Sequence, residues 1–404
     1  MTNRIRATLI SISIVVLSYV IVGGLLGKSE TGSEKTYRDL GVYSEVLNRI
    51  NQEYVTQPDL RKVTDGAIRG LLDSLDPYST YLTPEEYKEY LDHPDPGPAS
   101  LGLFVSKRMG YATVVAVLPG SPGEKAGVKP GDLIDEIDGV PARQYSVVQL
   151  DRLMAGQPNT TVKLSLVREA RVEPQSVTIT RAVLNYPPVI SKMVENGTGY
   201  MRVATFDKGK AREIGAKLKE LESQGAHKVI LDLRDCAGGD VQEAVDTVSL
   251  FLSKGLVTYI AGQRFPRKDM DVHPIGKVCT LPLAVLINQS TAGPAELVAS
   301  AILGNKRGEV VGVRSFGVGV YQEPVPVGDG SALLLAVAKY FGPDGKAINE
   351  NGVTPSVIQP ASTDADADED NQPEEPEHFG GKDDLQLQKA IQVLEQGAAP
   401  AKAA

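Results

Sequence analysis

The stretch Lys228-Val-Ile-Leu-Asp-Leu-Arg-Asp-Cys-Ala-Gly-Gly239 decides the fold of this 404-residue chain. Its apolar part, Lys228–Leu233, predicts a buried strand, and the residues after it favour a tight turn before a helix. Val285–Asn288 is a second expected buried strand, which leads into a helix from Pro294 to about Leu303. Strands that alternate with helices indicate an α/β core, which places chemistry at the carboxyl ends of its strands.

The same alternation continues on both sides of this stretch, from residue 185 to residue 360. Further strands are expected at Gly199–Val203, Glu309–Val313 and Ala332–Tyr340. An amphipathic helix is expected at Lys208–Gln224, because its apolar residues recur at helical spacing. Residues 185–360 are therefore predicted to form one α/β domain.

A separate β-rich domain is predicted for residues 98–183. The proline-rich segment His93-Pro-Asp-Pro-Gly-Pro98 favours neither helix nor strand and marks its start. Two short helices are expected inside it, at Ser121–Ala126 and Ser146–Met154. Its expected strands, separated by turn residues, are Leu103–Val105, Thr113–Val117, Leu133–Ile137, Val162–Val167 and Ser176–Thr180.

The segments that flank these two domains have simpler signals. Residues 40–92 carry apolar side chains at helical spacing, and Thr83 with Glu86 three residues later predicts a capped helix start. Residues 361–382 are acidic, and because 361–377 lack hydrophobic periodicity we expect disorder there. Residues 383–396 then have one apolar side and are expected to form a helix that docks back on the core.

The N-terminus predicts a route out of the cytoplasm. Arg4 and Arg6 precede an uncharged run from Ala7 to Gly27 that is long enough to span a bilayer. Residues 1–27 are therefore expected to be a transmembrane signal-anchor or, as the alternative, a cleaved signal peptide. We expect a single-pass protein of the bacterial inner membrane, with its body in the periplasm or another extracytoplasmic space.

Charge and cysteine content narrow the class of function. The formal net charge of -9 comes mainly from the acidic tract, so the folded body is near neutral and nucleic-acid binding is not expected. Cys236 and Cys279 are too few to stabilise the body by disulfides and match no metal motif, and the four histidines are scattered. No metal and no cofactor is predicted.

The β-rich domain resembles a PDZ domain in the circularly ordered form of bacterial proteases. The residues that carry the resemblance are Ser121-Pro-Gly-Glu-Lys-Ala-Gly-Val-Lys-Pro-Gly-Asp-Leu-Ile-Asp-Glu-Ile-Asp-Gly139. The resemblance implies that Ser100, Leu101, Gly102 and Leu103 offer backbone N–H groups to the C-terminal carboxylate of a peptide. Strand Leu103–Val105 would then add the peptide to the sheet edge. The alternative is a structural β-domain that binds nothing.

The chain from about Tyr43 to Leu394 resembles a carboxyl-terminal processing peptidase, a tail-specific protease of peptidase family S41. The resemblance implies a ClpP/crotonase-like α/β core with an inserted PDZ domain and an N-terminal helical segment. Besides the PDZ segment, the motifs that carry it are Asp65–Leu82, Leu231–Asp235 with Gly238-Gly239, Tyr340–Gly345 and Asn351–Pro355.

The family uses a serine nucleophile and a lysine base, and this chain departs from both. Aligning Asn288 and Glu296 with the family motif puts the nucleophile position at Gly293. The lysine position in Phe316-Gly-Val-Gly319 is Val318, and the glutamine that orients the lysine is retained as Gln322. The resemblance also implies oxyanion donors at Gly238 and Gly239, whereas Pro294 has no N–H to donate.

The residues at these two positions cannot perform the family chemistry. Gly293 has no side chain to attack a carbonyl, and Val318 cannot accept a proton. We therefore predict a pseudopeptidase that binds C-terminal or unfolded peptide segments and scaffolds an active peptidase or envelope proteins. The alternative is a serine-type endopeptidase with a rerouted active site. The side chains considered for such a site are Ser290, Thr291, Ser315, Cys236, Arg314, Lys306 and Lys339, of which arginine stays protonated and the two lysines read as surface residues.

Overall fold

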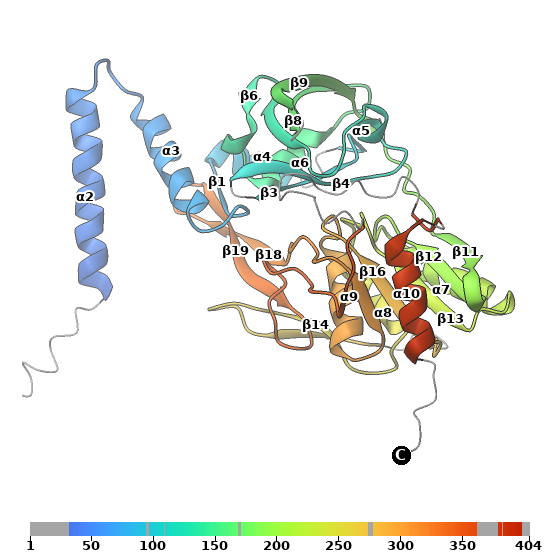
Figure 1. The fold of residues 1–404 in the computed structure, drawn as a ribbon. Helices are drawn as coiled ribbons and strands as arrows, with labels where there is room; N and C mark the ends of the chain where they lie inside the picture. Colours follow the sequence, from blue (N-terminus) through green and yellow to red (C-terminus); the bar gives the residue numbers. More distant parts are fainter. Residues whose placement is uncertain are drawn as a thin grey trace, which may run out of the picture. The chain divides into compact units, whose positions relative to one another are not determined.

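The computed structural model describes residues 32–93, 97–108, 110–168, 171–273, 278–361, 379–381 and 383–397 (Figure 1). The chain divides into two units, one that ends at Ile68 and one that starts at Arg69, and each is described by itself. The apolar run 7–27 and most of the acidic tract lie outside the described residues, so the predictions for them stay predictions. Within the described ranges, no helix has the length and apolar character needed to cross a membrane.

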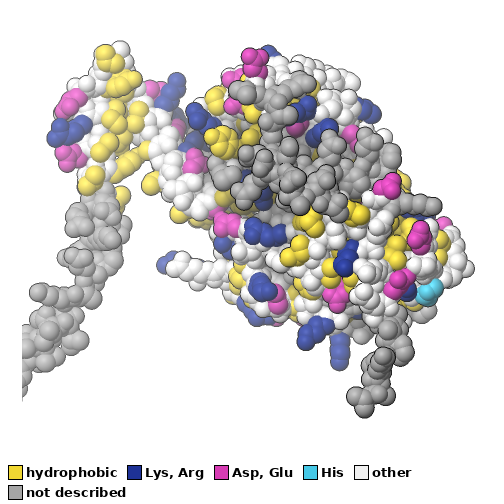
Figure 2. Space-filling model, viewed as in Figure 1, with side chains coloured by type: hydrophobic (Ala, Val, Ile, Leu, Met, Phe, Trp, Pro, Cys, Tyr) yellow, Lys and Arg dark blue, Asp and Glu magenta, His cyan; other side chains and the backbone are white. Residues whose placement is uncertain are grey.

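The first unit is helical. Helix α2 (Gly32–Glu53) is followed by α3 (Leu60–Asp73), whose last residues belong to the second unit. Several apolar side chains of α2 face solvent, with Leu40, Val42 and Val46 at least half exposed, and Figure 2 shows them gathered along the helix.

The second unit begins with a capped helix. Strand β1 (Thr80–Leu82) leads into helix α4 (Pro84–Asp92). The Thr83 hydroxyl accepts a hydrogen bond from the Glu86 N–H at 3.2 Å, and the Glu86 carboxylate accepts one from the Thr83 N–H at 2.8 Å. This reciprocal arrangement is the capping box that the sequence predicts, and it satisfies two backbone donors at the helix start.

The β-rich domain is an antiparallel sheet with the strand order β3-β4-β5-β8-β9, and it has a hydrophobic core of its own. Helices α5 (Pro122–Lys125) and α6 (Val147–Met154) accompany it, and α6 packs against β3. All five expected strands are present, and several are longer than expected. The strands are β3 (Leu103–Arg108), β4 (Tyr111–Val117), β5 (Leu133–Ile137), β8 (Thr161–Arg168) and β9 (Arg171–Thr180), with the two-residue strand β6 (Val140–Pro141) beside β5.

A small second sheet closes the entry and exit of this domain. Strand β2 (Ala99–Ser100) lies between β7 (Ala155–Gly156) and β10 (Ala182–Val183), and both pairings are antiparallel. The two ends of the domain are therefore hydrogen-bonded to each other, as expected for a domain inserted into another chain segment.

The α/β core is built on a six-stranded sheet with the order β11-β12-β13-β16-β17-β20. The edge strand β11 runs antiparallel to its neighbour, and the other pairings are parallel. The strands are β11 (Ile190–Val194), β12 (Thr198–Arg202), β13 (Lys228–Asp232), β16 (Leu283–Ile287), β17 (Glu309–Gly312) and β20 (Val357–Ile358).

Helices cover both faces of this sheet. On one face, α7 (Lys210–Ser223), α8 (Val241–Ser249) and α9 (Pro294–Gly304) bury the largest hydrophobic cluster of the described residues. On the other face, α10 (Leu385–Gly397) packs Leu387 and Ala390 against the strands, as the sequence predicts for the C-terminal helix. Both β13 and β16 are buried along their whole length, which fits their near-continuous apolar sequences.

A second sheet with the order β1-β19-β14-β15 adjoins the core, and β18 also pairs with β19. Strand β19 (Ala332–Phe341) matches an expected strand. Three strands of this sheet were not expected from the sequence: β14 (Leu256–Ala261), β15 (Lys268–Asp271) and β18 (Val320–Pro326). The overall architecture is the predicted one, an α/β core with an inserted β-rich domain and N-terminal helices.

Candidate functional site

Two loops meet at the carboxyl ends of the adjacent parallel strands β13 and β16. The Asp235 N–H donates to the Asn288 side-chain oxygen at 3.0 Å, and the Asn288 amide donates back to the Asp235 carboxylate at 2.8 Å. The Ala292 N–H donates to the Cys236 carbonyl at 2.9 Å. These bonds fix the loop that ends in Gly293 against the glycine turn, Cys236-Ala-Gly-Gly239, at the edge where α/β folds place their sites.

Gly293 is the N-cap residue of α9, directly before Pro294. Its backbone angles, φ 63° and ψ -122°, lie where a side chain is strained and glycine is not. A Cβ atom added at Gly293 would meet no other atom within 4 Å. The position therefore has room for a side chain, and the strained conformation is typical of a nucleophile held on a sharp strand-to-helix turn.

The loop that carries Val318 is held by one buried carboxylate. Glu296, on the first turn of α9, accepts hydrogen bonds from the N–H groups of Gly317 at 2.7 Å and Val318 at 2.9 Å, and from the Ser315 hydroxyl at 2.6 Å. It also accepts the Gly293 N–H at 2.9 Å. Burial raises the pKa of Glu296 to about 7, against the effect of these four donors, which favour the ionised form.

The glycine turn cannot tolerate side chains. Gly238 and Gly239 both have positive φ, at 73° and 106°. A Cβ at Gly239 would lie 2.3 Å from the Phe206 carbonyl carbon. A Cβ at Gly238 would lie 2.0 Å from the ring of Phe104, which comes from β3 of the β-rich domain. The Phe104 ring therefore packs directly against Gly238 of the turn.

Phe104 belongs to an apolar cluster between the two domains. On the core side, Ala237 and Ala292 are buried, and Phe316 and Val318 pack against them. On the β-rich side the cluster contains Val115, Ala116 and Phe104. Arg108, also from β3, lies with its guanidinium 5.0 Å from the centre of the Phe316 ring. Val318 is thus a packing residue in a largely apolar interface.

Gln322 lies on β18 and donates its side-chain N–H to the Tyr78 carbonyl at 2.9 Å. Tyr78 is buried, and its hydroxyl lies 3.4 Å from the Ser106 hydroxyl on β3. In this arrangement Gln322 ties the segment before β1 to the core. Its predicted orienting role has no lysine to act on, because position 318 is valine.

Three protein-family models match successive parts of this chain. Residues 197–358 match the model of peptidase family S41, residues 113–168 match a PDZ domain, and residues 24–86 match the N-terminal domain of the activating protease CtpB. The chain is 30% identical over 363 residues to the carboxy-terminal-processing protease of Bartonella bacilliformis, covering 88% of this chain and 82% of that protein. The chain belongs to the carboxy-terminal processing peptidases of family S41.

Two further relatives agree with this assignment. The carboxy-terminal processing protease CtpA of Bacillus subtilis is 33% identical over 316 residues, which cover 78% of this chain and 67% of that protein. A solved structure entitled photosystem II D1 C-terminal processing protease superposes with a TM-score of 0.65 at 26% identity, over 78% of this chain and 92% of that one. The predicted family and fold class are confirmed, and the β-rich domain is a PDZ domain.

Two of the three hydroxyls near Gly293 are already used as donors, those of Thr291 and Ser315. The Thr291 hydroxyl is fully buried and donates to the Leu233 carbonyl at 2.8 Å. The Ser315 hydroxyl donates to Glu296 and accepts the Val353 N–H at 2.7 Å. Ser290 makes no hydrogen bond to a lysine or histidine side chain among the described residues. None of these three hydroxyls hydrogen-bonds to a lysine or histidine within the described ranges, and the serine–lysine mechanism of the family needs a lysine partner.

Cys236 is no substitute nucleophile for this S41 fold. It is completely buried below the glycine turn, and burial raises the pKa of its thiol far above the physiological range. The thiolate is the reactive form of cysteine, so Cys236 is an unreactive core residue.

The nearby lysines do not replace the S41 base. Lys306 and Lys339 are exposed, Lys306 after the far end of α9 and Lys339 on β19. The 11 residues of α9 place its ends about 16 Å apart at 1.5 Å per residue. Lys210, which the sequence analysis did not single out, is buried, and its Nζ donates to the Pro187 carbonyl at 2.8 Å and to Glu213 at 3.0 Å. These contacts hold its side chain against Pro187 and Glu213.

The PDZ loop that was expected to hold a carboxylate is buried. The Leu101 N–H donates to the Met154 carbonyl at 3.2 Å, and the Gly102 N–H donates to the Ser100 hydroxyl at 3.3 Å. A Cβ at Gly102 would lie 2.3 Å from the Ser121 Cβ, so the loop is also tightly packed against Ser121. The roles predicted for Ser100, Leu101, Gly102 and Leu103 stay predictions, but two of the N–H groups already have acceptors.

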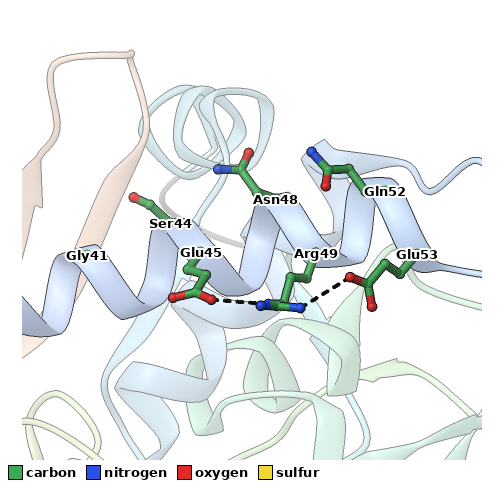
Figure 3. Close-up of a pocket in the computed structure, with 7 residues that line it drawn as sticks. All are labelled: Gly41, Ser44, Glu45, Asn48, Arg49, Gln52 and Glu53. Atoms are coloured by element: carbon green, nitrogen blue, oxygen red, sulfur yellow. Dashed lines mark hydrogen bonds and ion pairs between the residues drawn. The ribbon is translucent and has the colours of Figure 1, made fainter.

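A hollow on α2 in the first unit is another concave feature. It is lined from Gly41 to Glu53 by one face of a single helix, where Arg49 pairs with Glu45 and Glu53 (Figure 3). A single exposed helix face encloses no ligand, so we assign no chemistry to it. Among the described residues, no group of three or more His, Cys, Asp or Glu side chains is arranged to hold a metal ion.

Three contacts important for the site were not foreseen from the sequence. Glu296 accepts hydrogen bonds from both Gly293 and Val318. Phe104 reaches the glycine turn, and Arg234 anchors the C-terminal helix. The Arg234 guanidinium is fully buried and donates to the Asp384 carboxylate at 2.9 and 2.7 Å, besides Asp232. The sequence contains charged residues in Leu231–Asp235 and at Asp384, but which of them pair depends on the fold.

Proposed function

We propose that this S41 member is a pseudopeptidase, a protein that binds extended peptide segments through its PDZ domain and does not cleave them. C-terminal tails and unfolded segments are the ligand class that the PDZ fold supports. The carboxy-terminal processing function of its relatives would then survive here as recognition alone.

The observation that carries the proposal is the pair of residues at the positions that the motif alignment assigns to the nucleophile and the base. Gly293 has space but no nucleophile, and Val318 lies in an apolar cluster where a lysine would stand in an active member. No hydroxyl beside Gly293 hydrogen-bonds to a lysine or histidine, as far as the described residues extend. Without a nucleophile and a base, acyl transfer loses the step that forms the covalent intermediate.

Peptide binding is supported by the open edge of the PDZ sheet. Strand β3 has β4 on one side, and no described strand pairs with its other side. A strand with an unpaired edge can accept an extended peptide as an additional strand, with main-chain hydrogen bonds for affinity. Helix α6 packs against β3 and would form the second wall of such a groove.

We further propose that Ala7–Gly27 anchors the chain in the bacterial inner membrane, with Arg4 and Arg6 on the cytoplasmic side and the body outside. There it would hold substrates or envelope proteins near an active peptidase. The support is the sequence pattern alone, because these residues lie outside the described ranges.

The competing function is an active serine-type endopeptidase. The names of the two relatives from Bartonella and Bacillus, both proteases, favour it. It would require a nucleophile other than position 293 and a base other than position 318.

A paired cleavage and binding experiment tests the proposal. The full chain in detergent micelles is incubated with casein and with a fluorescent peptide that ends in apolar residues. We expect binding of the peptide and no new fragments. Fragments that disappear in Thr291→Ala or Cys236→Ala would instead establish the rerouted peptidase. The double variant Gly293→Ser with Val318→Lys serves as the positive control, since a side chain at 293 meets no neighbour.

A further inference from the structure

The backbone donors of the PDZ loop differ in what they can still bind. The Leu101 and Gly102 N–H groups are committed to Met154 and to Ser100. The Leu101 carbonyl also accepts the Gly123 N–H at 2.8 Å, and Leu101 has no exposed surface. A terminal carboxylate that binds these two N–H groups would have to break those bonds.

The backbone N–H and C=O of the next residue, Leu103, point away from β4. The Leu118 N–H donates to the Gly102 carbonyl at 2.8 Å, which makes Gly102 and Leu118 a hydrogen-bonded pair of the β3–β4 ladder. Leu103 lies opposite Val117 in the following, non-hydrogen-bonded position. In an antiparallel pair the N–H and C=O of such a residue point away from the partner strand. Those of Leu103 therefore point to the open edge of β3.

The arginine beside this loop is also committed to protein acceptors. Arg181, next to Gly156 in the small sheet that contains Ser100, donates to the Leu153 carbonyl at 2.7 Å and to the Thr160 hydroxyl at 2.8 Å. Its Nε has no hydrogen-bond partner in the structure but is shielded from solvent. A ligand carboxylate would have to compete with these acceptors for the donors of Arg181.

We infer that this PDZ domain binds internal extended segments of unfolded polypeptides by strand addition to β3, and that a free C-terminal carboxylate adds little to binding. The inference rests on the proposed peptide-binding function and specifies its ligand. The main-chain groups of β3 beyond the filled loop supply the hydrogen bonds, and their partners are present in any extended segment, terminal or internal. The chain would then recognise exposed unfolded stretches and not tails.

The test compares three versions of one peptide on the full chain in detergent micelles. The peptide is an extended alternation of valine and threonine with a lysine at its N-terminus for the fluorophore. It is made with a free C-terminal carboxylate, with a C-terminal amide, and with a further Ser-Gly-Ser-Gly extension. We expect dissociation constants within about twofold of one another and new amide-exchange protection over Leu103–Arg108.

Variants of Ser100 sharpen the comparison. Ser100→Ala removes the acceptor of the Gly102 N–H, so it should tighten binding of the free acid relative to the amide by several-fold, since a freed N–H can donate to the charged group. Ser100→Thr keeps the hydroxyl and should leave the ratio unchanged.

Each remaining outcome counts against a specific claim. A free acid that binds about tenfold or more tightly than the amide to the unmodified chain would overturn the inference and leave the proposed function intact. Equal affinities with protection outside β3 would overturn it as well. If none of the three peptides binds, the proposed function itself fails.

Discussion

The Glu296 carboxylate accepts a hydrogen bond of 2.9 Å from the backbone N–H of Val318. The same carboxylate accepts the Gly293 N–H, so one buried side chain holds both residues that the motif alignment assigns to the nucleophile and base positions. Glu296 therefore fixes the loop of Val318 to the start of α9. This arrangement explains why the loop with Val318 keeps its place without a lysine.

The variant Glu296→Gln should destabilise the fold. The substitution replaces one accepting oxygen by an NH₂ group that only donates, so at least one of the N–H groups at Gly293, Gly317 or Val318 would lose its acceptor in a buried site. We expect a fall in the free energy of unfolding of about 2–4 kcal/mol, at roughly 1–3 kcal/mol for each buried group left unsatisfied. Chemical denaturation measures the loss. The exposed Glu195→Gln is the control, and an equal loss there would remove the argument.

The contribution of Glu296 should also depend on pH. Its pKa is raised by burial to about 7 in the folded chain, whereas an unfolded glutamate titrates near about 4.3. Between these values the folded chain keeps a proton that the unfolded chain has released, so this contribution is fully present below about pH 4 and is lost as the pH rises through about 7. The difference amounts to roughly 4 kcal/mol at about 1.4 kcal/mol per pKa unit.

Unfolding free energies of the unmodified chain and of Glu296→Gln, measured from about pH 4 to 8, isolate this effect. Titrating groups that the substitution does not touch cancel in the difference between the two proteins. The advantage of the unmodified chain should shrink as the pH rises. A difference that stays constant over the range would mean that Glu296 is ionised throughout.

The contact between Phe104 and Gly238 predicts a non-additive pair of variants. Gly238→Ala puts a Cβ 2.0 Å from the Phe104 ring, so it should cost more than backbone strain alone. Gly127→Ala is the matched control, because Gly127 has a similar φ of 76° and no neighbour within 4 Å of an added Cβ. Adding Phe104→Ala to Gly238→Ala should recover at least about 1 kcal/mol, the size expected for residues in contact. Strict additivity would show that the PDZ strand does not rest on the glycine turn.

The buried ion pair of Arg234 with Asp384 should decide whether the C-terminal helix stays docked. Arg234→Met leaves the carboxylates of Asp232 and Asp384 buried without their partner, and such a loss costs about 3–5 kcal/mol. Limited proteolysis should then release a fragment that contains α10. Arg267→Ala, which removes an exposed pair with Asp269, should cost less than about 1 kcal/mol and release nothing.

Local signals in the sequence predicted the elements of the core well. The apolar runs of β13 and β16, the proline after Gly293 and the turn glycines each have a local physical cause, and the structure has them where expected. Strand β15 was missed because its sequence, Lys268–Asp271, is charged and mostly exposed. It is a strand only because β14 provides a hydrogen-bonding edge, and tertiary context of this kind overrides propensity.

In the candidate site, too, some features follow from local sequence and others depend on the fold. The register that assigns Gly293 and Val318 to the nucleophile and base positions depends on residues close together in the chain, and it stays a prediction. The roles of Glu296 and Phe104 could not be predicted, because they depend on which loops the fold brings together. The filled PDZ loop is a similar case, since Ser100 and Met154 become neighbours only through the small sheet of β2 and β7.

The most direct test of the account is an overnight cleavage assay of the unmodified full chain, with casein as substrate and mass spectrometry as the readout. The account predicts intact casein in the presence of a chain that binds the peptide probes, and fragments only when Gly293→Ser and Val318→Lys are introduced together. Casein fragments from the unmodified chain that persist at constant yield through successive purification steps would contradict it, because no residue at positions 293 and 318 could have produced them.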